Sequence, residues 1–233
     1  MMTRKVDLSA RTCWRVRDRR RPIRKIYELL YVRFGPQHWW PARTRFEVVV
    51  GAVLTQNTSW KNVERAIANI ERNGCLSLEG ILRCRSLPEL LRPSGYYNVK
   101  ARRLMALCEW LQTNGGLDAV FEWPIDRLRD GLLGVKGVGE ETADSIILYA
   151  AGKPSFVVDA YTRRVLARVG LIDGKERYDQ VQRLFMDSLP RDARLYNEYH
   201  ALLVELGKCI CTKNEPDCSA CPLSESCNHA SGR

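Results

Sequence analysis

The spacing of apolar residues along the chain predicts a succession of amphipathic helices. The clearest pattern lies at residues 140–151, where apolar side chains recur at intervals of three and four residues and so share one helical face (Ala143, Ile146, Ile147, Ala150 and Ala151). The same spacing predicts further helices, at residues 23–34, 60–70, 87–91, 95–111, 126–133, 161–166, 178–185 and 195–206. No internal repeat or clear pair of alternating strands interrupts this pattern. The chain is therefore expected to be all-α.

One segment, Phe46–Leu54, fits two structures. Its continuous run of apolar and β-branched residues, among them Val48, Val49 and Val50, is compatible with a buried strand. A polar turn at residues 55–59 follows, and helical spacing resumes directly after it. We therefore predict a buried helix.

Glycines mark the turn between two of the predicted helices. Gly137-Val138-Gly139 lets the backbone turn sharply and approach a partner closely. The unpaired N–H groups at the start of the second helix carry partial positive charge, which suits a phosphate. A turn that only connects two helices is the alternative interpretation. Lys136, on the outer side of the turn, is a further candidate for phosphate contact.

An acidic residue stands at the start of a later helix. The apolar run Phe156–Val158 places Asp159 at the first turn of the helix predicted at residues 161–166. An aspartate in this position commonly caps the helix N-terminus and stabilises it by ~1 kcal/mol. A carboxylate in a chain with a phosphate-binding turn can also be catalytic. These residues alone leave both roles open.

The positive charge of the chain is concentrated at its N-terminus. The formal net charge is +10, and residues 1–25 contain ten basic and two acidic residues. Such a segment can bind nucleic acid through release of counterions. A solvated arm is an equal alternative, and a transit peptide is disfavoured by Asp7, Asp18 and the scarcity of serine. No apolar run is long enough to span a membrane, so no membrane partner is expected.

Cysteines crowd near the C-terminus. Four of them follow the spacing C-x6-C-x2-C-x5-C in a segment too short to bury a core of its own (Cys211, Cys218, Cys221 and Cys227). Four thiolates can hold a zinc ion or a 4Fe-4S cluster, and the spacing does not decide between them. Cys209 lies outside the pattern and is not expected to be a ligand.

Taken in order, the hairpin glycines, Thr142-Ala143, Val158-Asp159 and the four cysteines resemble the helix-hairpin-helix DNA glycosylases of the endonuclease III superfamily. The resemblance implies base-excision repair of double-stranded DNA that contains a damaged or mismatched base. It implies Asp159 as the catalytic carboxylate and a 4Fe-4S cluster on the four cysteines. It also implies DNA contact through the hairpin and allows a monovalent cation there (Lys136, Gly137, Val138 and Gly139).

Several aromatic and polar residues take roles from the same resemblance. Gln56 matches a residue that fills the gap left by an extruded base, although a polar capping turn also explains it. Tyr96 matches an intercalating residue, beside basic residues that could contact phosphate (Lys100, Arg102 and Arg103). Trp39, Trp40 and Trp60 are candidates for the base pocket, with simple packing as the alternative for the first two.

One position departs from the family pattern. Bifunctional members carry a lysine two residues after the second hairpin glycine, where its amine forms a Schiff base with the sugar, and this chain has Glu141. We therefore predict a monofunctional glycosylase with weak or no lyase activity, and count Glu141 among the catalytic candidates. Three motifs together resemble the branch that includes 3-methyladenine DNA glycosylase III: Trp39-Trp40-Pro41, the polar loop at residues 54–58 followed by Trp60, and the hairpin segment at residues 135–146. This resemblance favours alkylated purines as the substrate. A uracil or thymine mismatch glycosylase and an inactive iron–sulfur DNA-binding protein are the alternatives.

Motif order and resemblance together predict the architecture. A helical barrel domain spans residues 43–151, a discontinuous domain of residues 23–42 plus 152–233 carries the cluster loop, and residues 1–22 form a basic tail. DNA is expected in the cleft between the two domains. We expect a cytoplasmic, nucleoid-associated monomer.

Overall fold

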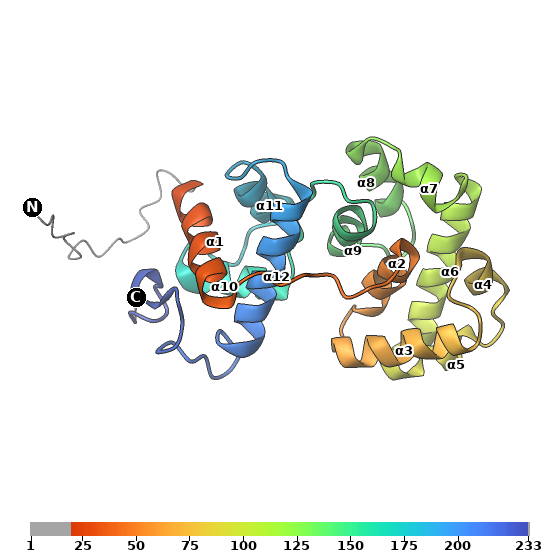
Figure 1. Ribbon diagram of the computed structural model, residues 1–233, viewed down its shortest axis with the longest axis horizontal. Helices are drawn as coiled ribbons and strands as arrows, with labels where there is room; N and C mark the ends of the chain where they lie inside the picture. The colour runs from red at the N-terminus through yellow and green to blue at the C-terminus, as the bar shows by residue number, and fades with distance from the viewer. Residues whose placement is uncertain (1–19, 233) are drawn as a thin grey trace, which may run out of the picture. The chain divides into compact units, whose positions relative to one another are not determined.

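The chain is helical throughout the part that the structure describes. This structure, a computed structural model, describes residues 20–232, and within that range it contains helices and no strand (Figure 1). The prediction of an all-α fold is confirmed. Residues 1–19, which make up most of the predicted basic tail, lie outside the described residues.

The helices belong to two compact units. Of the described residues, the terminal unit contains 20–37, Val158–Arg191 and 198–232, and the central unit contains His38–Val157 with Asp192–Asn197. The terminal unit comprises α1 (Arg20–Phe34), α10 (Ala160–Val169), α11 (Tyr178–Met186), most of α12 (Ala193–Cys209) and η3 (Ser224–Ser226). The central unit comprises α2 (Arg45–Leu54), α3 (Trp60–Arg72), α4 (Leu78–Arg83), α5 (Leu87–Leu90), η1 (Arg92–Ser94), α6 (Tyr97–Thr113), α7 (Gly116–Phe121), α8 (Ile125–Leu133), α9 (Glu140–Ser145) and η2 (Ile146–Ala150). The predicted domain limits stay a prediction.

Helix α2 forms the centre of the core of the central unit. Thr44 caps it, because its hydroxyl oxygen accepts a hydrogen bond from the Glu47 N–H at 3.1 Å. Every residue from Phe46 to Leu54 is buried, and α2 packs against α3, α6 and η2. Burial on all sides accounts for the unbroken apolar run, and the helix predicted here is confirmed.

The helix predicted at residues 140–151 changes its winding part-way. Helix α9 continues into η2, a π-helical turn of five residues. The apolar side chains of the predicted stripe are nevertheless in the core (Ala143, Ile146, Ile147 and Ala150). Sequence spacing therefore predicted the buried face but not the change in winding.

Two short helices were not predicted. Helices α4 and α7 have six residues each, too few for apolar periodicity to be recognised. Ser77 caps α4 by accepting a hydrogen bond from the Gly80 N–H at 3.0 Å. Gly115 and Gly116 both have φ near +90°, and α7 begins at the second of these glycines.

In the terminal unit, Tyr199 of α12 packs against α1 and α11. Its hydroxyl donates to the Ile23 carbonyl oxygen at 2.7 Å, and its ring lies 5.3 Å from the ring of Tyr27 and 5.3 Å from that of Phe185. Burial raises the pKa of Tyr199 well above its ordinary value. Among the described helices, none has both the length and the apolar character needed to cross a membrane.

Candidate functional site

The turn between α8 and α9 has the expected hairpin form. Gly137 adopts a φ of +93°, in the left-handed region that favours glycine, and an added Cβ there would overlap the side chain of Arg103. Gly139 is extended instead, with φ −95° and ψ 178°, and is the N-cap of α9. Val138 is buried, whereas Lys136 is exposed. The turn therefore presents backbone and one lysine side chain at the surface of the central unit.

Two acidic residues occupy the first turn of α9. Glu140 and Glu141 are both exposed. Carboxylates in this position interact favourably with the partial positive charge of the helix N-terminus. Glu141 has no amine with which to form a Schiff base, so its chemical contribution can only be that of a carboxylate.

Gln56, in the loop between α2 and α3, lies against the hairpin. Its Nε2 donates to Thr142 Oγ1 at 2.9 Å and to the Gly137 carbonyl oxygen at 3.3 Å, and its Oε1 accepts from Arg103 Nη1. The amide is thus bonded on both sides within the central unit. A monovalent cation at the hairpin stays a prediction.

Tyr96 is at the surface, at the N-terminus of α6. Its side chain is 74% exposed and its backbone has a φ of +45°. The next residue, Tyr97, packs on the core instead, with the guanidinium of Arg92 5.6 Å from its ring centroid. The two adjacent tyrosines therefore divide between exposure and packing.

The three tryptophans of the candidate base pocket lie in one aromatic cluster. The Trp40 ring lies 5.6 Å from Trp39, 5.1 Å from Trp60 and 4.8 Å from Tyr149. The indole N–H groups of Trp39 and Trp40 are buried without a hydrogen-bond acceptor among the described residues. Gly51 of α2 gives the rings room, because a Cβ there would lie 3.3 Å from Trp40 Cζ2. The cluster rests directly on the α2 backbone.

Asp159 caps α10 and pairs with a histidine in the terminal unit. Its Oδ1 accepts from the Thr162 N–H at 2.7 Å, and its Oδ2 lies 3.5 Å from His200 Nε2. Burial is the largest influence on the pKa of Asp159 and would raise it. The charge and hydrogen bond of His200 act in the opposite direction, together with the hydrogen bonds of Thr162. Their sum lowers the pKa below its ordinary value. The buried carboxylate is therefore ionised at neutral pH.

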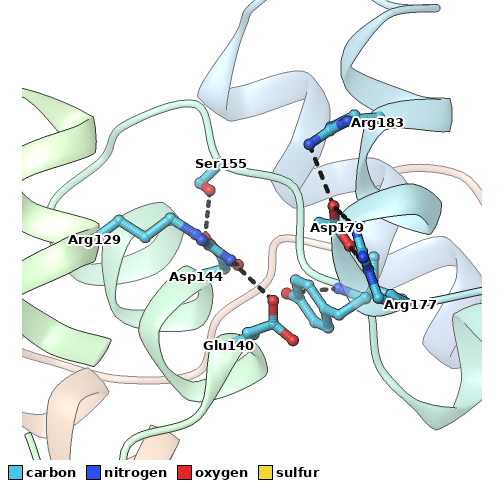
Figure 2. Close-up of polar contacts among 9 residues, drawn as sticks. Arg129, Glu140, Asp144, Ser155, Arg177, Asp179 and Arg183 are labelled. Carbon is cyan, nitrogen blue, oxygen red and sulfur yellow. Dashed lines mark hydrogen bonds and ion pairs between the residues drawn. The ribbon is translucent and has the colours of Figure 1, made fainter. Parts of the chain in front are cut away.

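A buried ion pair connects α8, α9 and the segment after η2 (Figure 2). Arg129 Nε and Nη2 donate to the two oxygens of Asp144 at 2.9 and 3.1 Å, and Ser155 Oγ donates to Asp144 Oδ1 at 2.6 Å. Glu140 lies farther from the same guanidinium, at 3.8 Å. Figure 2 also shows an exposed group in the terminal unit, in which Asp179 accepts from Arg177 and Arg183. The buried pair orients the helices on both sides of the hairpin.

The four cysteines of the predicted cluster loop follow α12. Arg168 Nη1 donates to Cys211 Sγ at 3.2 Å, and Cys227 Sγ donates to the Arg168 carbonyl oxygen at 3.2 Å. Burial raises the pKa of Cys221; the Leu223 N–H opposes this rise and the other three cysteines add to it. As they stand, residues 20–232 contain no group of three or more His, Cys, Asp or Glu side chains arranged to hold one metal ion.

Comparison with known families decides the relationship. The family described as HhH-GPD superfamily base excision DNA repair protein matches residues 50–191, which include the Gln56 loop, the hairpin and Asp159. The chain belongs to this superfamily. The predicted membership of the helix-hairpin-helix DNA glycosylases related to endonuclease III is thereby confirmed. As an HhH-GPD protein, the chain is a DNA repair glycosylase with DNA as its partner.

Three similar proteins place the chain within the HhH-GPD superfamily. A candidate DNA repair glycosylase of Methanocaldococcus jannaschii is 49% identical over 210 residues, which cover 88% of this chain and 95% of the relative. A thymine/uracil-DNA glycosylase of Pyrobaculum aerophilum is 32% identical over 209 residues, which cover 83% and 85%. The crystal structure of H. pylori 3-methyladenine DNA glycosylase bound to 1,N6-ethenoadenine has a TM-score of 0.70 at 31% identity and covers 82% of this chain and 97% of that one.

Sequence reasoning missed several residues of this HhH-GPD chain. Lys100 was grouped with the phosphate contacts, but it is buried, and its Nζ donates to backbone carbonyls. Its spacing from Leu104, Leu107 and Leu111 on the buried face of α6 was a signal that could have revealed this. The contacts of Tyr149 and of His200 had no local signal, because their partners are distant in sequence.

Proposed function

We propose that this chain is a monofunctional DNA glycosylase that hydrolyses the N-glycosidic bond of a damaged base, with Asp159 as its carboxylate. The buried, ionised side chain of Asp159 carries the proposal. An ionised carboxylate held by the Thr162 N–H and by His200 is already oriented, so it loses little energy in reorganisation during the reaction.

The reaction needs a negative charge next to the sugar. Cleavage of the bond between C1′ and the base nitrogen leaves its electron pair on the base and develops positive charge on the sugar ring. The Asp159 carboxylate would stabilise that charge and accept a proton from the water that attacks C1′. The base must first leave the helical stack, which costs a few kcal/mol and is easiest at a damaged or mismatched pair.

Glu141 is the reason to propose hydrolysis without strand cleavage. A lyase reaction needs an amine that attacks C1′ and forms a Schiff base, and a carboxylate cannot do this. Borohydride treatment of the reacting protein and DNA should therefore trap no covalent adduct. Efficient trapping would contradict the monofunctional assignment.

For the substrate, we propose alkylated purines such as 3-methyladenine. The aromatic cluster of Trp39, Trp40, Trp60 and Tyr149 supports this, because a cationic base gains cation–π attraction that a normal base lacks. The H. pylori relative is a 3-methyladenine glycosylase by name. The second candidate is uracil or thymine in a mismatch, which the name of the Pyrobaculum relative favours.

DNA contact is proposed at the hairpin and at two loops. The exposed Lys136 and the backbone from Gly137 to Gly139 would bind phosphate, with Gln56 and the exposed Tyr96 in contact with the opened duplex. Phosphate contacts of this kind position the protein without reading sequence, which suits an enzyme that meets lesions in any context.

The four cysteines fit an iron–sulfur cluster by their chemistry. Thiolates are the ligands of 4Fe-4S clusters, and Cys211 Sγ accepts a hydrogen bond from the Arg168 guanidinium. Each thiolate of such a cluster binds a different iron, so the four sulfurs need not converge on one point as zinc requires. The bound cluster would supply a cross-link for residues 211–227. Anaerobically prepared protein should be brown with broad visible absorption, and a colourless zinc-loaded protein would contradict the assignment.

An oligonucleotide panel tests the activity. Duplexes that contain 3-methyladenine, 7-methylguanine, hypoxanthine, thymine glycol or a uracil or thymine mismatch are incubated with the protein and then treated with alkali. Wild type should release the alkylated purines. Asp159→Asn should retain DNA binding and lose base release, because asparagine caps helices as well as aspartate does but carries no charge. Asp179→Asn, the same substitution at a half-buried ion pair of the terminal unit, should behave as wild type. Binding without release of any base would favour the inactive DNA-binding protein.

A further inference from the structure

Lys100 is a buried lysine whose ammonium group has two backbone partners. Its side chain is 1% exposed, and Nζ donates to the Leu54 carbonyl oxygen at 2.9 Å and to the Ser94 carbonyl oxygen at 2.6 Å. Burial, and then the charge of Arg103, lower the pKa of Lys100 to about 8. A lysine so far from water cannot contact phosphate, so its role must lie inside the central unit.

The two carbonyl groups stand at the bases of the two loops proposed to contact the opened duplex. Leu54 is the last residue of α2 and precedes the loop that carries Gln56, and Ser94 is the last residue of η1 and precedes Gly95-Tyr96. Each loop contains a residue with positive φ that is not glycine, Asn57 at +53° and Tyr96 at +45°. Such conformations cost free energy and persist where the surroundings fix the backbone. One ammonium group is therefore hydrogen-bonded to the bases of both loops.

A second basic residue on α6 extends the same connection. Arg103, one turn after Lys100, donates to Gln56 Oε1, and its side chain lies against Gly137. Residues three apart on a helix share a face, so Lys100 and Arg103 act from one side of α6. Together they connect both loops and the hairpin to a single helix.

A cation is well suited to this place. The Leu54 carbonyl is at the C-terminal end of α2, where the helix dipole is negative and carbonyl oxygens lack intrahelical donors. An apolar side chain of equal length would fill the volume but leave both carbonyl oxygens without this donor. The two loop bases would then lose their shared contact.

We propose that Lys100 is a positioning residue that fixes the Gln56 loop relative to the Tyr96 loop, so that the two side chains enter a damaged duplex as a pair. The inference rests on the proposed function, in which both side chains contact the opened duplex. It assigns to Lys100 an action on DNA recognition through the two loops rather than through direct contact.

A double-mutant cycle tests this coupling. Dissociation constants are measured for a duplex with a stable abasic-site analogue, using Gln56→Ala, Tyr96→Ala and the double variant, in the wild-type and in the Lys100→Met background. With Lys100 present, the change in dissociation constant of the double variant should differ from the product of the two single changes by a coupling factor on the order of tenfold. With Lys100→Met, the coupling factor should fall to about one. Unfolding is followed in parallel, since a purely structural lysine would change stability and leave the coupling factor intact.

Two further variants keep the test decisive. Lys100→Gln retains amide donors without the charge, and it replaces Lys100→Met if the methionine variant does not fold. The coupling factor measured in Lys100→Gln should be clearly below that of wild type. Lys175→Met removes an exposed lysine of the terminal unit and should leave the coupling factor unchanged. Coupling that persists in both folded Lys100 variants overturns the inference alone. If Gln56→Ala and Tyr96→Ala do not alter binding even in wild type, the proposed DNA contacts of the two loops are wrong, and the inference fails with them.

Discussion

Asp144 and Glu140 both face the guanidinium of Arg129, but they should differ greatly in their contribution to stability. Asp144 is fully buried and accepts two hydrogen bonds from Arg129 and one from Ser155, whereas Glu140 is 45% exposed and 3.8 Å away. We compare Asp144→Ala with Glu140→Gln. Both substitutions remove one negative charge from the same arginine. Asp144→Ala also removes the acceptor oxygens, so Asp144→Asn is the matched partner of Glu140→Gln for the effect of burial and geometry.

The expected magnitude follows from the contacts. Removing one partner of a buried ion pair typically costs about 3–5 kcal/mol, because the other charge is left without compensation. The Arg129 side chain keeps 23% exposure and can recover part of its hydration, which lowers the expected loss. The hydroxyl of Ser155 also loses its acceptor, at about 1 kcal/mol. We expect Asp144→Ala to cost about 2–4 kcal/mol of the free energy of unfolding and Glu140→Gln less than about 1 kcal/mol.

Urea unfolding of the two variants beside wild type measures these losses. The slope of free energy against urea must stay the same, since a changed slope would mean that the denatured or native state has changed. Asp144→Asn is an informative third variant, because it keeps an acceptor for Ser155 without the charge and should fall between the other two. Equal losses for Asp144→Ala and Glu140→Gln would refute the reasoning.

Four further outcomes are expected. Glu141→Lys should gain a borohydride-trappable adduct on DNA that contains an excised base, and an absent adduct would show that position 141 does not reach the sugar. Gly51→Ala should lower the rate of base excision several-fold, because the added methyl group displaces Trp40. The free energy of unfolding measured in urea should change little, because the higher helix propensity of alanine offsets the crowding. Gly137→Ala should lower stability by about 1–3 kcal/mol and weaken DNA binding, since alanine is strained at a φ of +93°; wild-type behaviour in both assays would contradict this. The pKa of Lys100 is lowered from 10.5 to about 8 in the folded protein, so between these pH values the unfolded chain binds more protons than the folded one. The free energy of unfolding of wild type should therefore rise with pH in this window. Lys100→Met should lack this rise.

The sequence was sufficient for those features that depend on neighbouring residues. The long helices were predicted within a few residues, and the polar turn after Leu54 decided correctly between strand and helix for α2. The capping position of Asp159 also followed from local pattern, because an apolar run ended directly before it. Each of these inferences uses residues that are close together in the chain.

Features that depend on contacts between distant segments could not be predicted. Lys100 donates to the Leu54 carbonyl, 46 residues away in sequence, and Tyr149 joins Trp40 only because the chain folds back on itself. The π-helical turn η2 carries the same apolar pattern as an α-helix, so the pattern could not reveal it. The pairing of Asp159 with His200 likewise needed the fold, since nothing near either residue indicates the other.

The double role proposed for Asp159, as helix cap and as catalyst, has an evolutionary consequence. As the N-cap of α10, the residue contributes to folding in any descendant of this chain, whether or not that descendant acts on DNA. Asparagine satisfies the same cap, so the replacement of one oxygen atom by an amino group would end catalysis while the fold and the DNA-binding surface persist. Under the proposed function, a repair enzyme of this kind is a single codon change away from a damage-recognition protein, and the stability lost in that change comes from the pairing with His200 and not from the cap.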